Sequence, residues 1–210
     1  MKNKVEEAIS DIYNLSLRRT CEEIMSYEQF FEWPASTGKH HGYVGGLAKH
    51  TIEVLEYALH NAELFGEDVD KDQLIAACLW HDFAKLWDYK LVTYLKKEYD
   101  KLPEHYVLHS KSSVTGIYEI KPDPEDQWRK VFIADTDYKS QIHHITGSVA
   151  EFTAAALKHN VGRATIQDVQ HCIISHHGRK EWGSIKEPQT LEAMILHHAD
   201  NMSAKFGAAK

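Results

Sequence analysis

The side chains best suited to chemistry in this sequence are histidines that stand in pairs or beside an acid. The chain has 15 histidines among 210 residues, more than surface positions alone would account for. His81 and Asp82 are adjacent at the end of the apolar run 74–85. An imidazole next to a carboxylate at the end of a buried helix is typical of one half of a metal site. The candidates for the other half are His50, His143, His144, His176, His177 and Asp200.

Helical spacing indicates that several of these side chains point into the protein. His176 follows Val169 by seven residues and Cys172 by four, so it shares their apolar face, and His81 follows Cys78 by three. One inward histidine is usually a hydrogen-bonded core residue. A buried imidazole without a partner is costly, however, and several together favour a metal ion that binds them all. Ligands arriving from several helices suit the core of a helical bundle.

Hydrophobic periodicity predicts the helices that position these residues. The pattern predicts a helix over 3–30, broken once before Tyr27, and others over 47–65 and 72–87. Thr165 opens a further helix through a capping box completed by Asp168. Thr190 caps the last helix, 191–204.

The segment 88–142 has a different character. Its β-branched and aromatic runs predict two to four short strands, separated by prolines. The candidate strands are residues 90–94, 105–108, 116–120 and 130–133. We therefore expect a mostly α fold, a helical bundle with a small β-rich insertion.

Composition limits the classes of function. A net charge of −7 weighs against broad electrostatic capture of long nucleic acids, although it does not exclude a local basic patch. The N-terminus lacks the apolar core of a signal peptide, and the apolar segments are interrupted by charge, so no membrane association is expected. Cys21, Cys78 and Cys172 are widely spaced, which favours free thiols in the cytoplasm.

The order of these motifs resembles the HD superfamily of metal-dependent phosphohydrolases, and looks most like the HD domain of YhaM-type 3′→5′ exoribonucleases. An HD pair alone is weak evidence, but the ordered set, spread over roughly 28–206 outside the insertion, is specific. The matching segments are residues 30–36, 39–51, 80–85, 142–145, 174–178, 183–188 and 191–202. The resemblance implies one HD domain over 1–210, with a helical extension at 1–26 and the β-rich insertion at 88–142.

The resemblance also implies roles for individual residues. The first metal set corresponds to His50, His81, Asp82 and Asp200. His144 and His176, with His177 as a further candidate, match the histidines that hold a second metal, and Asp82 would bridge the two ions. Lys85 matches a lysine that meets a phosphate oxygen, so Asp82 and Lys85 are the expected catalytic residues.

The chain departs from the family pattern in several places. His143 stands where a glycine is usual, which leaves the choice between His143 and His144 open, and Ala84 also replaces a common glycine. The insertion is longer, the net charge is acidic, and no N-terminal nucleic-acid-binding domain of the OB type is expected.

Mixed imidazole and carboxylate ligands favour two divalent ions, with Mn²⁺ preferred and Fe²⁺, Co²⁺, Zn²⁺ or Mg²⁺ as alternatives. Such a pair can activate water for attack on phosphorus. Residues expected to orient the phosphate or protonate the leaving oxygen are His40, His41, His177, Arg179 and Lys186.

The substrate expected from these features is a nucleotide or a short oligonucleotide, cleaved by a 3′→5′ exonuclease-like phosphodiesterase. A nucleotide phosphomonoesterase is the alternative. A di-iron oxygenase and a non-catalytic nucleotide-binding module also remain open. The 88–142 insertion, rich in tyrosine and tryptophan, could join two copies of the chain.

Overall fold

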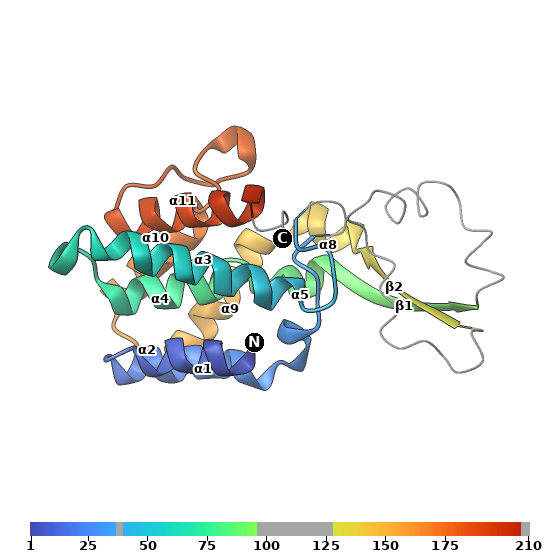
Figure 1. The fold of residues 1–210 in the computed structure, drawn as a ribbon, viewed down its shortest axis with the longest axis horizontal. Helices are drawn as coiled ribbons and strands as arrows, with labels where there is room; N and C mark the ends of the chain where they lie inside the picture. Colours follow the sequence, from blue (N-terminus) through green and yellow to red (C-terminus); the bar gives the residue numbers. More distant parts are fainter. Residues whose placement is uncertain (37–39, 96–127, 207–210) are drawn as a thin grey trace.

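The computed structural model describes residues 1–36, 40–95 and 128–206, and they form a mostly α fold with one small sheet, as the sequence predicts (Figure 1). The α-helices are α1 (Lys2–Ser10), α2 (Leu15–Glu22), α3 (Gly46–Glu63), α4 (Lys71–Trp80), α5 (Lys85–Asp88), α8 (Thr136–Gln141), α9 (His144–Lys158), α10 (Arg163–Ser175) and α11 (Leu191–Phe206). Short 3₁₀ helices are η1 (Glu23–Ser26), η2 (Glu28–Phe31), η3 (Gly66–Asp68) and η4 (Lys180–Trp182). The strands are β1 (Tyr89–Leu95) and β2 (Trp128–Ala134).

Helices α3 and α4 form the middle of the molecule. Helix α11 packs along α3, α10 packs against α4, α9 and α11, and α1 and α2 cover the opposite side (Figure 1). The core between them contains large side chains without solvent exposure, among them Phe30, Phe83 and Phe152. The contact between α3 and α11 joins segments far apart in the sequence, and it brings His50 near Asp200. In the described residues, no helix is both long and apolar enough to cross a membrane.

The loop that contains His40 and His41 passes very close to the backbone at the start of α3. The amide of Ala35 donates to the carbonyl oxygen of His41 at 3.1 Å. A Cβ placed on Gly46 would lie 1.8 Å from that same oxygen. Only glycine admits this approach, so Gly46 allows the His40–His41 segment to lie over α3.

Strands β1 and β2 form an antiparallel pair, matched from Tyr89 with Ala134 to Leu95 with Trp128. The two strands project from the helical body (Figure 1). The base of this pair is attached to the core, because the Trp33 indole donates to the Tyr89 carbonyl oxygen at 3.1 Å. The candidate strands at 105–108 and 116–120 lie outside the described residues.

The end of the insertion is helical rather than extended. Residues 136–141 form α8, because the Asp135 side chain accepts a hydrogen bond from the Tyr138 amide at 3.2 Å and caps the helix. The segment predicted as the β-rich insertion therefore also contains a short helix, which the sequence analysis did not predict.

Two of the predicted helices are each divided in the structure. The N-terminal one stops at residues 11–14, where the amides of Tyr13 and Asn14 donate to the Asp72 carboxylate at 3.0 and 2.7 Å. The helix predicted over 72–87 ends at Trp80, and α5 begins after a turn at 81–84. In that turn the Ala84 amide donates to Ser148 Oγ at 3.0 Å instead of continuing the helix.

Of the two predicted helix caps, the structure bears out one. The Ala193 amide donates to Thr190 Oγ1 at 3.2 Å, so Thr190 caps α11. Helix α10 begins at Arg163 after Gly162, which places Thr165 within its first turn. The capping-box prediction for Thr165 was wrong, because a helix can begin without a side-chain cap when its first amides reach solvent.

Candidate metal centre

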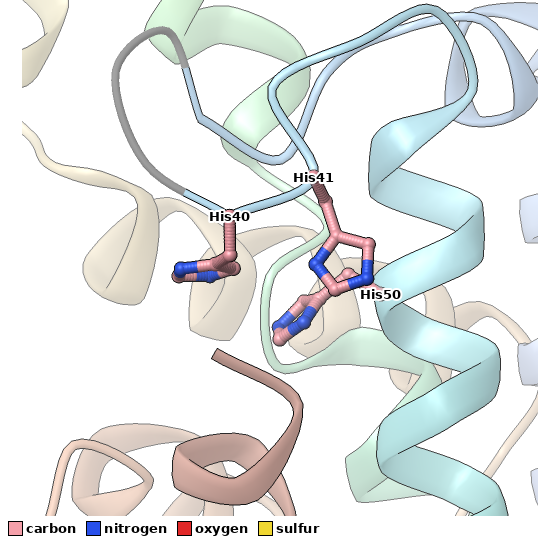
Figure 2. Close-up of side chains that lie close together, drawn as sticks. All are labelled: His40, His41 and His50. Carbon is pink, nitrogen blue, oxygen red and sulfur yellow. The ribbon is translucent and has the colours of Figure 1, made fainter. Parts of the chain in front are cut away.

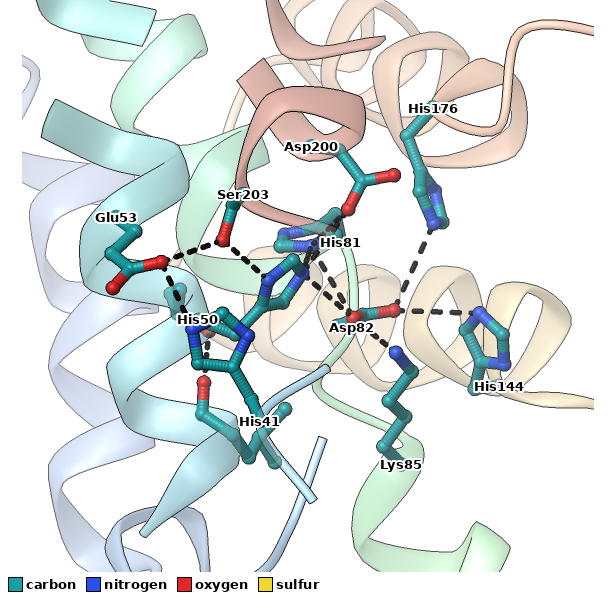
Figure 3. Close-up of polar contacts among 12 residues, drawn as sticks. His41, His50, Glu53, His81, Asp82, Lys85, His144, His176, Asp200 and Ser203 are labelled. Carbon is teal, nitrogen blue, oxygen red and sulfur yellow. Dashed lines mark hydrogen bonds and ion pairs between the residues drawn. The ribbon is translucent and has the colours of Figure 1, made fainter. Parts of the chain in front are cut away.

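Four side chains from three parts of the fold converge beside α3 (Figure 3). His50 comes from α3, His81 and Asp82 from the turn after α4, and Asp200 from α11. His50 Nε2 lies 3.3 Å from Asp82 Oδ2, 3.1 Å from Asp200 Oδ1 and 3.3 Å from His81 Nε2. The four ligand atoms all lie within 4.8 Å of one another. We call these residues the first cluster.

The other oxygen of Asp82 faces a second group of imidazoles. Asp82 Oδ1 lies 3.4 Å from His144 Nε2 and 3.7 Å from His176 Nε2 (Figure 3). The ring of His177 lies 4.3 Å from that of His176, centroid to centroid. We call His144, His176 and His177 the second cluster. Asp82 therefore presents one carboxylate oxygen to each cluster, as a carboxylate that bridges two metal ions does.

Hydrogen bonds fix which nitrogen of each ring carries the proton. His81 Nδ1 donates to the Cys78 carbonyl oxygen at 2.8 Å, and His176 Nδ1 donates to that of Ile173 at 2.7 Å. A carbonyl oxygen can only accept, so Nδ1 carries the hydrogen and Nε2 keeps a lone pair. His177 follows the same pattern, since its Nδ1 donates to the Trp182 carbonyl oxygen at 2.9 Å. These rings are preset to bind a cation through Nε2.

His50 is oriented by two residues that the sequence analysis did not identify. Its Nδ1 lies 2.9 Å from Ser203 Oγ, which donates in turn to Glu53 Oε2 at 3.0 Å (Figure 3). Burial would raise the pKa of Glu53, but Lys49 and His41 hold it below its ordinary value. The ionised Glu53 makes Ser203 the donor toward it, which leaves Ser203 to accept from His50.

A third residue that the sequence analysis did not identify is Asp88, the last residue of α5. The carboxylate is buried, and its Oδ2 lies 3.3 Å from His144 Nδ1. Helical spacing could have indicated Glu53, which follows His50 by one turn. No local signal indicated Asp88 or Ser203, because both act on residues distant in the sequence.

The polar atoms at the centre lack the partners that buried groups normally have. Asp82 Oδ1, His144 Nε2 and His176 Nε2 make no hydrogen bond to any described residue. Buried polar groups are nearly always satisfied, so these atoms point to a missing partner. Lone pairs on imidazole and carboxylate suit a divalent transition metal, and the residues therefore fit such an ion.

Electrostatics keep Asp82, His144 and His176 in the forms that bind a metal. Burial alone would raise the pKa of Asp82, but the ammonium group of Lys85 holds it well below its ordinary value. Burial holds the pKa values of His144 and His176 well below the usual range, so both rings are neutral. Lys85 Nζ lies 2.6 Å from Asp82 Oδ2.

A pocket of about 290 Å³ opens beside the first cluster. Of the five predicted substrate-binding residues, His40 and His177 line this pocket, together with Lys85. His41 does not: its buried ring lies 5.6 Å from that of His40, centroid to centroid (Figure 2), and its Nε2 donates to Glu53 Oε2 at 2.9 Å (Figure 3).

The remaining two predicted substrate-binding residues do not line the pocket. The guanidinium of Arg179 lies over the ring of Trp182, 5.1 Å from its centroid. Lys186 is exposed and, like Arg179, is not part of the pocket lining.

The choice between His143 and His144 follows from the backbone. His144 faces Asp82, whereas His143 is the residue before α9 and has φ 67° and ψ 146°. That conformation is one that glycine adopts readily and that costs other residues about 1–3 kcal/mol. This conformation explains physically why the family pattern usually has a glycine at the position of His143.

Replacing His143 with glycine is therefore expected to stabilise the metal-free protein by about 1 kcal/mol, after the entropy of the added glycine is subtracted. Urea unfolding, monitored by circular dichroism, measures the difference. His143→Ala is the matched control, because it removes the ring and keeps the strained backbone. A glycine variant no more stable than the alanine variant would contradict the prediction.

Comparison with known proteins adds independent information. A family model described as "HD domain" matches residues 47–205. The chain is 30% identical over 208 residues to "3'-5' exoribonuclease YhaM" of Geobacillus sp., covering 98% of this chain and 52% of that protein. It is 28% identical over 208 residues to the protein of the same description from Bacillus licheniformis, covering 98% of this chain and 54% of that protein. The chain thus spans about half the length of these relatives. No solved structure gave a significant match.

Proposed function

Since this chain belongs to the HD domain family, we propose that it is a metal-dependent phosphohydrolase, a 3′→5′ exonuclease-like phosphodiesterase acting on short oligonucleotides. The observation that carries the proposal is the carboxylate of Asp82, whose two oxygens face separate imidazole clusters. The similarity to proteins described as 3′-5′ exoribonucleases supports the nuclease reaction.

The residues proposed to hold the metal are the first cluster and, for a second ion, His144 and His176 together with Asp82. Manganese is the proposed ion, because the mixed nitrogen and oxygen donors suit it better than magnesium. When bound, two divalent ions supply an activated water molecule and charge stabilisation for the phosphoryl group. The protein contributes preset rings and a buried setting that strengthens these interactions.

Lys85 is the residue proposed to contact the phosphate directly. Its side chain is 12% exposed and lines the pocket, so its ammonium group is accessible from there. Burial would lower its pKa, but the Asp82 carboxylate raises the pKa of Lys85 to about 12. Lys85 therefore stays protonated at neutral pH. It can stabilise charge on a non-bridging oxygen, but it cannot serve as a general base.

A nucleotide phosphomonoesterase is the second candidate, and the net charge of −7 favours it because a long polyanion would be repelled. A small mononucleotide needs only the local cations of the site, such as Lys85. Both reactions require the same metal centre, so they differ only in how much of the substrate lies outside it.

Incubation of manganese-loaded protein with an oligonucleotide labelled at its 5′ end, and separately with mononucleotides, tests the proposal. We expect a ladder of shortened labelled products, and no ladder after treatment with EDTA. An oligonucleotide with a phosphorothioate at its last linkage should resist shortening and serves as the control. Inorganic phosphate released from mononucleotides, without a ladder, would replace the nuclease by the phosphomonoesterase. No hydrolysis of either substrate with any divalent metal would reject both.

We also propose that the chain acts in the cytoplasm and forms one HD domain over 1–210, with extension 1–26 and insertion 88–142. All three cysteines are free and buried, which supports a reducing compartment. The packing of α1 on α4, and of α2 on α4 and α9, supports a single domain. Self-association through 88–142 stays a prediction, because residues 96–127 lie outside the described part.

A further inference from the structure

The pocket beside the first cluster has a second wall that the proposed chemistry does not use. Its lining includes Lys85 and Asp200 from the metal centre. It also includes Trp182, His197 and Asn201, which belong to neither cluster. A single pocket of about 290 Å³ thus has Lys85, the proposed phosphate contact, on one side and aromatic and amide side chains on the other.

Trp182 is exposed to an extent unusual for such a large apolar side chain. It lies in η4 and 52% of it is accessible. Its carbonyl oxygen accepts the hydrogen bond from His177 Nδ1, so its backbone is attached to a residue of the second cluster. Arg179 lies over the ring and adds a cation to it. The indole is therefore held at the edge of the metal centre.

His197 is held beside Trp182 by equally specific contacts. Its Nδ1 donates to the His176 carbonyl oxygen at 2.8 Å, which leaves Nε2 as an acceptor. A Cβ on Gly178 would lie 2.2 Å from the His197 ring, so glycine is what lets the ring pack there. The Trp182 and His197 rings lie 6.3 Å apart at 31°. Two aromatic rings are thus preorganised on one wall of the pocket.

We propose that Trp182 and His197 form a subsite for the nucleobase of the nucleotide whose phosphate lies at the metal centre. This inference rests on the proposed function. A nucleotide carries an anionic phosphate and a flat base on one sugar, and the pocket offers a cationic end and an aromatic wall. Stacking on aromatic side chains tolerates every base, so the subsite would accept any nucleotide and bind it more tightly than a phosphate ester without a base.

Asn201 completes this wall. Its side chain is partly exposed and makes no hydrogen bond to another described residue. The amide can both donate and accept, so it can pair with the edge of a stacked base. Trp182 supplies most of the contact area, and we therefore test the subsite at that residue.

The test compares two ligands with the same sugar phosphate. Calorimetric titration measures the binding of adenosine 5′-monophosphate and of ribose 5-phosphate to the manganese-loaded protein, and chromatography checks afterwards that both ligands are intact. The wild-type protein should bind the nucleotide about tenfold to a hundredfold more tightly. Trp182→Ala should bring this ratio close to one while ribose 5-phosphate binds as before. Trp182→Phe should keep most of the ratio.

Tyr13→Ala is the matched control, because Tyr13 is 88% exposed and not part of the pocket lining; it should leave the ratio unchanged. A wild-type ratio near one, or a Trp182→Ala variant that keeps the wild-type ratio, would overturn the subsite. Either result is compatible with hydrolysis of oligonucleotides. Failure of the proposed function is recognised separately, by the absence of phosphoester hydrolysis in the oligonucleotide assay.

Discussion

Replacing Asp82 with asparagine is expected to remove bound metal from the protein and to lower phosphodiester hydrolysis by about a thousandfold or more. The carboxylate contributes one oxygen to each cluster, at 3.3 Å from His50 Nε2 and 3.4 Å from His144 Nε2. An uncharged amide cannot hold two cations together, so both positions should weaken at once. Metal analysis after purification without chelator, and the oligonucleotide assay, measure the two effects.

The control for this variant is Asp68→Asn, which changes an exposed carboxylate in η3 and should keep full metal content. Asp82→Asn also leaves the largely buried Lys85 without its anion, and breaking such a pair costs about 3–5 kcal/mol. The double variant Asp82→Asn/Lys85→Met removes both charges and should regain stability without regaining metal. An Asp82→Asn protein that folds and keeps wild-type metal content would show that Asp82 is not a ligand.

Replacing His176 with alanine is expected to have a different result, a fall from about two bound metal ions to about one, with activity lowered about a hundredfold or more. His176 is fully buried, and its Nε2 faces Asp82 Oδ1, the carboxylate oxygen that points to the second cluster. The first cluster keeps all four of its ligands. Metal stoichiometry distinguishes this partial loss from the complete loss expected for Asp82→Asn.

His198→Ala is the matched control, because His198 is an exposed histidine on α11 and should leave both ions in place. If His176→Ala kept the wild-type metal content and full activity, His176 would not be a metal ligand and the second cluster would be a structural histidine cluster. His144→Ala provides an independent check, since it removes the other imidazole that faces Asp82 Oδ1.

Local patterns predicted the elements whose stability is mainly local. Helix α3 was expected over 47–65 and is found at Gly46–Glu63, and the inward position expected for His176 agrees with its complete burial. The turn at 81–84 was missed, because the bond that forms it joins Ala84 to Ser148, and no window of neighbouring residues contains both. Helix α8 was missed because β-branched and aromatic residues nearby outweighed the cap at Asp135.

The sequence by itself determined which residue types could bind a metal and on which helices they lie. Only the tertiary structure decided how they meet, because the distances that matter join residues such as His50 and Ser203, which are 153 positions apart. It also decided that His144 rather than His143 faces Asp82, and that Trp182 lies beside the metal centre. Hydrophobic periodicity indicates which face of a helix is buried. Which helix packs against that face depends on contacts between segments distant in the sequence.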